Sequence, residues 1–162
     1  MKTCLVTVVF VLLASVMLSG CATSAERAAR AAEQAAMVKK ALEERHYKIG
    51  INHMYPMRGG AKHVSYNYSV EVRNDSLISY LPYFGRAYSL PYGGGKGLNF
   101  SERIGSYQES QKKDGKRQIE ISVKNDEDTY YYSIEVLDDG SSTIGVNCRS
   151  REHISYSGEM EF

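Results

Sequence analysis

The sequence predicts a mainly β domain, an antiparallel sandwich or small barrel of about seven to eight strands, with an N-terminal alanine-rich helix. Apolar and polar residues alternate along most of the chain after Tyr47, as expected for strands with one buried face. Turn signals separate these stretches about every 8 to 12 residues, a spacing typical of sandwiches and barrels. Tyrosine is abundant, with 13 residues against 4 Phe and no Trp, and it suits half-buried strands.

The N-terminus has the features of a bacterial lipoprotein signal peptide. Lys2 provides a positive start, and residues 5–18 form an apolar stretch shorter than the roughly 20 residues of a membrane helix. The sequence Leu-Ser-Gly-Cys at residues 18–21 resembles a lipobox. The resemblance implies cleavage before Cys21, lipidation of its thiol and attachment to a membrane outside the cytoplasm. The alternative is an ordinary secretory signal that is cleaved elsewhere, or an uncleaved anchor.

The residues around the lipidation site also bear on location. Ala22 stands where an Asp would favour the inner membrane under the usual lipoprotein sorting rule, so the outer membrane is expected. No acidic run follows Cys21, which favours the periplasmic face over surface export. We therefore expect a signal peptide at residues 1–20, a lipidated tether and helix at 21–46, and a β domain at 47–162.

A helix is predicted over residues 23–46, which begin with Thr-Ser-Ala-Glu, the spacing of a capping box. Apolar residues recur every three or four positions as a thin stripe of Ala28, Ala31, Ala35, Val38 and Leu42. The alanine-rich first half has the composition of a solvated spacer. Met37, Val38 and Leu42 give the second half enough bulk to dock on a domain. The sequence leaves spacer and docking helix as alternatives.

Strands are predicted from the alternation at residues 48–54, 63–73, 76–81, 100–107, 118–124, 130–136, 143–148 and 154–162. The clearest is 63–73, where every second residue from Val64 onward is apolar. The dipeptide Asp-Gly at 139–140 predicts a hairpin, and short connections favour a meander for the last four strands. Cys148 is in phase with the apolar residues of its strand, which predicts a buried and unreactive thiol.

Several chemistries find no support in the sequence. The net charge is +1, and no basic stripe with interleaved aromatics indicates nucleic-acid binding. The four histidines lack metal-ligand spacing, so no metal or other cofactor is expected. A Gly-x-Ser-x-Gly elbow is absent. Carboxylates that a glycosidase would need are predicted on solvated faces, namely Glu102, Glu109, Glu120 and Glu135. The acidic run 126–128 is expected to be a solvated turn, with weak Ca²⁺ contact as the alternative.

Four motifs resemble a known family. They are Tyr-Pro-Met-Arg-Gly at 55–59, Leu-Pro-Tyr-Phe-Gly-Arg-Ala-Tyr at 81–88, Tyr-Gly-Gly at 92–94 and Ile-Ser-Tyr-Ser-Gly at 154–158. Together they look like the domain-of-unknown-function family 4251, found in lipoproteins and secreted proteins of Bacteroidota, and the likeness covers roughly residues 44–161. The resemblance implies a mostly β domain outside the cytoplasm, and it implies no activity.

The first candidate site is the loop 82–99, which is rich in glycine and proline and long for a compact domain. Its candidate ligand- or partner-binding residues are Tyr83, Arg86, Tyr88 and Tyr92. Arginine offers a planar fork of donors for a carboxylate, phosphate or sugar, and tyrosine offers flat amphipathic faces. A second loop, 55–60, carries Arg58, which would join Arg86 in one pocket. The alternative is that Arg86 pairs inside the fold and that both loops merely connect strands.

We therefore expect a membrane-anchored lipoprotein of the cell envelope that acts as a non-catalytic binding or accessory module. Its expected partners are the membrane, through lipid on Cys21, and a glycan, a peptide or an envelope protein. An envelope or polysaccharide hydrolase and a structural or assembly lipoprotein are the alternatives. Acids clustered in a deep pocket would favour the hydrolase, and an exposed apolar helix face would favour assembly.

Overall fold

The structure is a computed structural model that describes residues 24–64, 67–89, 95–112 and 115–162. Cys21 and Tyr92, two of the candidate residues, lie outside the described residues. The chain divides into two compact units, Met1–Ala32 and Glu33–Phe162, and the second contains the strands. The elements are α2 (Ser24–Glu43), β1 (His46–Pro56), β2 (Lys62–His63), β3 (Ser69–Arg73), β4 (Ser76–Leu81), β5 (Leu98–Gln111), β6 (Arg117–Lys124), β7 (Thr129–Val136), β8 (Ser141–Asn147) and β9 (Ile154–Glu161).

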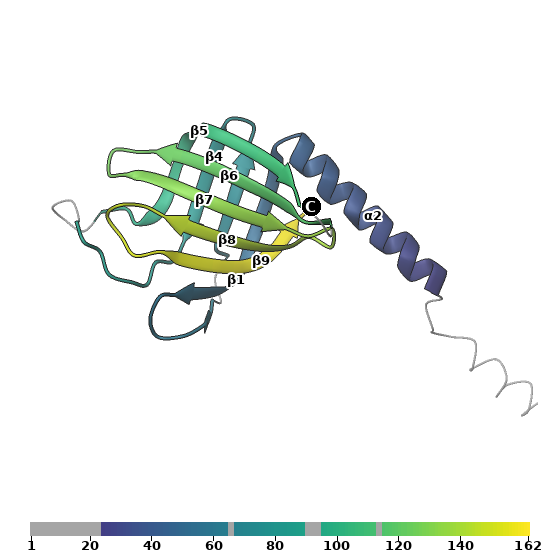
Figure 1. The fold of residues 1–162 in the computed structure, drawn as a ribbon, viewed down its shortest axis with the longest axis horizontal. Coiled ribbons are helices and arrows are strands. Elements are labelled where there is room, and N and C mark those ends of the chain that lie inside the picture. The colour runs from purple at the N-terminus through teal and green to yellow at the C-terminus, as the bar shows by residue number, and fades with distance from the viewer. Residues whose placement is uncertain (1–23, 65–66, 90–94, 113–114) are drawn as a thin grey trace, which may run out of the picture. The chain divides into compact units, whose positions relative to one another are not determined.

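The strands form a closed antiparallel barrel (Figure 1). From β3 to β9 each strand pairs with the next one along the chain, so the predicted meander is confirmed and extends beyond the last four strands. Strand β1 pairs with β3 on one side and with β9 on the other, which closes a ring of eight strands in the described chain. The short strand β2 pairs with His53 and Met54 of β1. The mainly β prediction is therefore confirmed, as a barrel rather than a sandwich.

The seam between β1 and β9 contains a β-bulge. Its register shifts between Ile51 and His53, so β1 has one extra residue relative to β9. Gly158 lies opposite Ile51, where a Cβ atom would collide with the carbonyl oxygen of Gly50. Only glycine fits this position without moving the β1 backbone, so Gly158 is a requirement of barrel closure.

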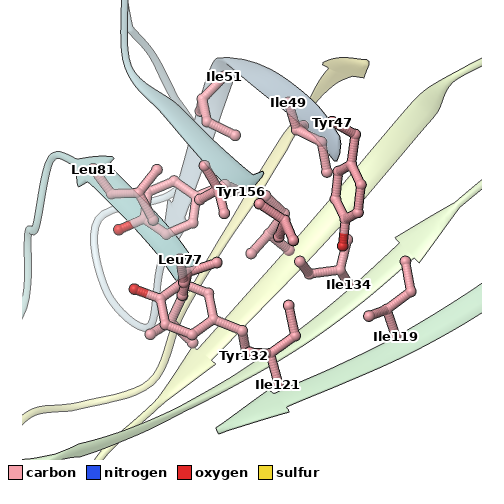
Figure 2. Packing of buried hydrophobic residues seen from close by; sticks show 14 of the residues in the cluster. Tyr47, Ile49, Ile51, Leu77, Leu81, Ile119, Ile121, Tyr132, Ile134 and Tyr156 are labelled. Atoms are coloured by element: carbon pink, nitrogen blue, oxygen red, sulfur yellow. The ribbon is translucent and has the colours of Figure 1, made fainter. Parts of the chain in front are cut away.

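The barrel interior is filled with side chains, including the rings of three tyrosines (Figure 2). The hydroxyl of Tyr132 donates a hydrogen bond of 2.9 Å to Ser79 Oγ, which in turn donates one of 2.7 Å to the carbonyl of Leu98. The hydroxyl of Tyr156 donates to the carbonyl of Pro82 at 2.7 Å. Burial raises the pKa of Tyr132 well above the ordinary tyrosine value. The interior is therefore a packed core, as is common in eight-stranded barrels, in which Tyr132 and Tyr156 have hydrogen-bonded hydroxyls and Tyr47 has a buried hydroxyl without a partner among the described residues.

The predicted strand at 63–73 is wrong as a single element, because the structure divides it into β2 and β3. A continuous strand that pairs Ser69 with Gly50 would place His63 opposite Pro56. His63 instead lies opposite His53, three positions away. The register of β2 on β1 therefore differs by three positions from the register of β3, and the two are separate strands. The other predicted strands are present, most with boundaries shifted by one to three residues and the strand at 100–107 extended to Leu98–Gln111.

The second half of α2 docks on the barrel. Val38 and Leu42 are buried and belong to the same core cluster as the barrel interior. Gln34 Nε2 donates a hydrogen bond of 2.5 Å to the carbonyl of Asp139, in the turn between β7 and β8. Met37, which was expected to add bulk to the interface, is 42% exposed. For the residues from Glu33 onward, α2 is a docking helix rather than a spacer.

Candidate functional site

The first part of the candidate loop is held by backbone pairing to the segment that precedes β9. Ala87 and Arg151 form an isolated antiparallel bridge. The amide of Tyr88 donates to the carbonyl of Ser150 at 2.7 Å, and the amide of Glu152 donates to the carbonyl of Arg86 at 3.0 Å. The described part of the loop is therefore a short two-stranded contact, although a loop without regular structure was expected.

This contact lies at the end of the barrel away from the docked half of α2. Strand β1 starts at His46, just after the helix, and runs the length of the barrel to Pro56. Pro56 pairs with Ile154, the first residue of β9, directly after the segment that holds the loop. The candidate site and the docked half of α2 thus lie at opposite ends of the barrel.

Tyr83 fastens the loop. Its hydroxyl lies 2.9 Å from the carbonyl oxygen of Arg86 and 3.0 Å from that of Glu152, so it donates to the backbone on both sides of the contact. Burial raises the pKa of this hydroxyl, which keeps it protonated as a donor. A Cβ atom on Gly85 would lie 2.7 Å from the same hydroxyl oxygen. Tyr83 therefore offers a ligand its half-buried ring, while its hydroxyl serves the loop.

Three of the five candidate binding residues line one open pocket of about 340 Å³, which we call the arginine pocket. Its lining consists of Arg58, Tyr83, Phe84, Gly85, Arg86 and Glu152. The structure thus brings Arg58 and Arg86 together from two separate loops. Tyr88 is exposed nearby but does not line the arginine pocket.

Phe84 and Glu152 are the members of the arginine pocket that sequence reasoning missed. Phe84 is 50% exposed, and the ammonium nitrogen of Lys62 lies 4.4 Å from the centre of its ring. A cation over a ring face is attracted by the ring's negative quadrupole. Phe84 belongs to the motif at 81–88, but alternation cannot show that an aromatic side chain in a loop faces solvent.

The charges of the arginine pocket are unevenly paired. The Glu152 side chain is only 11% exposed, and it accepts a hydrogen bond of 3.2 Å from the amide of Arg86. Arg58 Nη2 lies 3.9 Å from the same carboxylate, a distance at which an exposed ion pair contributes little. The exposed guanidinium of Arg86 makes no ion pair in the described part of the chain. Among the described residues, Arg86 therefore does not form the internal pair that was the alternative.

A buried ion pair lies beside the arginine pocket. Arg151 Nη2 is 3.5 Å from Glu127 Oε2, and the Arg151 guanidinium lies 5.4 Å from the centre of the Tyr83 ring. The other Glu127 oxygen accepts a hydrogen bond of 2.7 Å from the amide of Lys96. The expectation that the whole acidic run is solvated is therefore wrong for Glu127, because Arg151 supplies a buried countercharge that local sequence does not reveal.

The neighbouring acids are also engaged. Asn125 Oδ1 accepts from the amides of Glu127 and Asp128, and the two oxygens of Asp128 accept from the amides of Thr129 and Ser150. Burial would raise the pKa of Asp128, but hydrogen bonds from Ser150 and the adjacent backbone lower it overall. These oxygens therefore organise the turn by accepting hydrogen bonds from backbone amides.

The other groups considered for chemistry occupy separate places. Within the described ranges, no group of three or more His, Cys, Asp or Glu side chains is arranged to hold a metal ion. His53 and His63 face each other across β1 and β2 with ring centres 5.1 Å apart. Cys148 is half-buried against the core, and burial raises its thiol pKa. In the part of the chain that the structure describes, no helix has the length and apolar character to cross a bilayer.

Three of the four carboxylates considered for hydrolysis are engaged by side chains outside the arginine pocket. Glu109 pairs with Arg117 at 2.8 Å and Glu135 with Lys116 at 3.0 Å, both between neighbouring strands on the barrel surface. Glu120 accepts hydrogen bonds from Gln118 and Ser133. None of the three lines the arginine pocket.

Comparison with known proteins identifies the family. The model of the family described as "Domain of unknown function (DUF4251)" matches residues 29–160. A crystal structure of a DUF4251 family protein from Bacteroides eggerthii DSM 20697 is similar with a TM-score of 0.57 and 16% identity. The match covers 78% of this chain and 86% of the other, and at this identity it concerns the fold. No curated protein matches. Because the family model spans most of the sequence, the chain belongs to the DUF4251 family.

Proposed function

We propose that this protein is a non-catalytic binding module of the cell envelope, anchored in the outer membrane by lipid on Cys21 and facing the periplasm. The observation that supports the proposal is the arginine pocket, in which a guanidinium without an ion pair among the described residues lies with an exposed aromatic ring on a loop held by the barrel. Binding residues are commonly placed on loops that a stable scaffold positions. Arginine and aromatic side chains are also the residues that contribute most to binding interfaces.

The composition of the arginine pocket favours binding over hydrolysis. Its described lining has one carboxylate, Glu152, which already accepts a hydrogen bond from the amide of Arg86. Glycoside hydrolysis uses two carboxyl groups about 5 to 10 Å apart. The lining instead combines hydrogen-bond donors with ring surface, which suits the recognition of a glycan, a peptide or an envelope protein.

The placement of the arginine pocket fits a tethered protein. The chain enters the barrel unit through the docked half of α2, and the arginine pocket lies at the opposite end of the barrel. A chain attached through its N-terminus would therefore have this surface at the end remote from its point of entry. Such an arrangement leaves the arginine pocket accessible to partners in the periplasm.

The anchoring part of the proposal is tested by Cys21→Ser. The variant should leave the membrane fraction while its β-sheet circular dichroism stays unchanged, because the substitution lies outside the barrel. Continued sedimentation of Cys21→Ser with membranes would contradict a lipid anchor on this residue.

The binding part is tested by the melting temperature of the full chain in the presence of glycans, muropeptides, bile acids and lipids. A ligand of the arginine pocket should raise the melting temperature of the parent and not of Arg86→Ala. Arg103→Ala is the matched control, because Arg103 is an exposed arginine on β5 at the other end of the barrel. Turnover of a tested polysaccharide, or a shift that Arg86→Ala retains, would contradict a binding role for this pocket.

A further inference from the structure

We infer that the arginine pocket recognises a carboxylate group carried on an apolar body, such as the C-terminal residue of a peptide or a small apolar acid. The inference rests on the proposed function, since it names the class of ligand for that same site. It depends on three properties of the described residues: the surplus of positive charge, the carboxylate already present beside it, and the exposed ring.

Among the described residues, the positive charge at the arginine pocket exceeds the negative charge. Arg58, Arg86 and Lys62 surround the arginine pocket, and Glu152 is the one acid in its described lining. Arg58 contacts that acid only at 3.9 Å and remains 66% exposed, so its donors are largely free for a ligand. A guanidinium presents parallel N–H donors that match the two oxygens of a carboxylate.

Glu152 affects which anion the arginine pocket binds. Its carboxylate lines the arginine pocket and is held there by the amide of Arg86. Repulsion from this fixed negative charge is proportional to the charge of the incoming group. A phosphate monoester carries about −1.5 to −2 at neutral pH, whereas a carboxylate carries −1. Glu152 therefore reduces the advantage that the higher charge of a phosphate would have at the two arginines, while the planar carboxylate matches the fork of guanidinium donors.

The exposed ring of Phe84 favours a ligand in which the carboxylate is attached to an apolar group. Phe84 keeps half of its surface in solvent, and the Tyr83 ring forms another part of the wall. The volume of about 340 Å³ is near the lower limit of small-molecule sites, which span roughly 300 to 1,000 Å³. Such a space accommodates one apolar side chain rather than an extended sugar polymer. Burying that side chain against Phe84 would remove apolar surface from water on both partners.

The test compares two ligands that differ in one charge, N-acetylphenylalanine and N-acetylphenylalaninamide, by titration calorimetry with the full chain in detergent. Detergent alone is the blank. The carboxylate should bind at least about tenfold more tightly than the amide, the loss expected when a charged hydrogen-bond acceptor is removed. Phenyl phosphate replaces the carboxylate by a phosphate, and glucuronate replaces the apolar group by a sugar. Each should bind more weakly than N-acetylphenylalanine.

Variants assign the binding to the arginine pocket. Arg86→Gln should weaken the carboxylate about tenfold and leave the amide unchanged, because it removes a charged donor. Phe84→Ala should weaken both ligands. Arg103→Gln, the remote control, should alter neither. Because Arg86 and Phe84 are exposed, circular dichroism of these variants should match the parent.

A final comparison distinguishes the two sources of the carboxylate. A pentapeptide that ends in Phe with a free carboxylate should bind more tightly than N-acetylphenylalanine if chain ends are the ligand, and equally tightly if small acids are. Equal affinity for carboxylate and amide, or carboxylate binding that survives Arg86→Gln, would overturn the inference. If an uncharged glycan raises the melting temperature through Arg86 while the carboxylate does not bind, the inference fails and the proposed binding function stands.

Discussion

Arg151 and Glu127 form an ion pair in which both side chains are more than nine-tenths buried, with 3.5 Å between Nη2 and Oε2. Glu127 lies in the turn between β6 and β7, and Arg151 lies just before β9. Arg151 is also the residue whose backbone bridges Ala87. The pair therefore connects the acidic turn to the segment that holds the loop of the arginine pocket.

Removal of one partner of this pair should be strongly destabilising. Glu127→Ala leaves the Arg151 charge buried without its counterion, which costs about 3 to 5 kcal/mol in comparable pairs. Urea denaturation measures the loss. Asp126→Ala is the control, because the Asp126 carboxylate is exposed and its pair with Lys96 should contribute under about 1 kcal/mol. Equal effects of the two substitutions would contradict a structural role for the buried pair.

Barrel closure should depend on glycine at position 158. Gly158→Ala places a methyl group against the carbonyl of Gly50, so β1 and β9 must separate at their bulge. We expect a loss above about 4 kcal/mol, or failure to fold. Glu159→Ala, an exposed neighbour on the same strand, should change stability by less than about 0.5 kcal/mol. A Gly158→Ala protein with the parent's denaturation midpoint would show that the seam adapts easily.

Tyr83 and Gly85 should act as one unit. Tyr83→Phe removes the hydroxyl that bonds to both sides of the loop contact, and should cost about 0.5 to 1.5 kcal/mol. Gly85→Ala crowds that same hydroxyl oxygen and should cost a similar amount. The double variant should be hardly less stable than either single one, because the clash disappears with the hydroxyl. Additive losses in a thermal-denaturation cycle would show that the two residues act separately.

The docked half of α2 should contribute to barrel stability. Leu42→Ala removes a fully buried side chain from the core cluster and should cost about 2 to 5 kcal/mol. Met37→Ala, on the same helix and 42% exposed, should cost much less. Chemical denaturation of the two variants gives the comparison. Similar small losses would indicate that the helix is only loosely attached.

Asp128 should make the protein sensitive to acid. Its pKa is lowered in the folded state, so its contribution is complete above the unfolded pKa of about 4 and is lost as the pH falls through the folded value. The melting temperature of the parent should therefore decrease below about pH 4 more steeply than that of Asp128→Asn. Parallel curves for the two proteins would assign the acid sensitivity to other carboxylates.

The sequence was sufficient to predict most of the barrel, because seven of the strands alternate and those from β5 to β9 are joined by short turns. The break between β2 and β3 escaped prediction, since Val64, Tyr68 and Val70 keep the period of two across it. The break is a change of register, in which β2 pairs with β1 three positions away from the register of β3, and such a change has no local signal. The β1–β9 seam likewise joins residues about 100 positions apart, beyond the reach of periodicity.

The candidate site was predictable only in part. Arginines flanked by glycine in two loops indicated Arg58 and Arg86, and both line the arginine pocket. The hydroxyl of Tyr83 was expected to be available for a ligand, but distant backbone carbonyls use it. Glu127 appeared solvated because its sequence neighbours are polar, whereas its countercharge comes from a segment far along the chain. Contacts of this kind depend on topology, which composition and spacing do not specify.

Closure of the barrel affects how copies of the protein can aggregate when they are crowded together. Each strand of the ring has a neighbour on both sides, and in the described chain the short β2 is the strand with one partner only. Unpaired strand edges are templates on which copies of a protein aggregate, and natural sheets limit them by shortness and by lysine. Here the exposed edge is two residues long and carries Lys62. Copies concentrated on a surface would therefore have little backbone through which to polymerise, and side chains alone would decide what they bind.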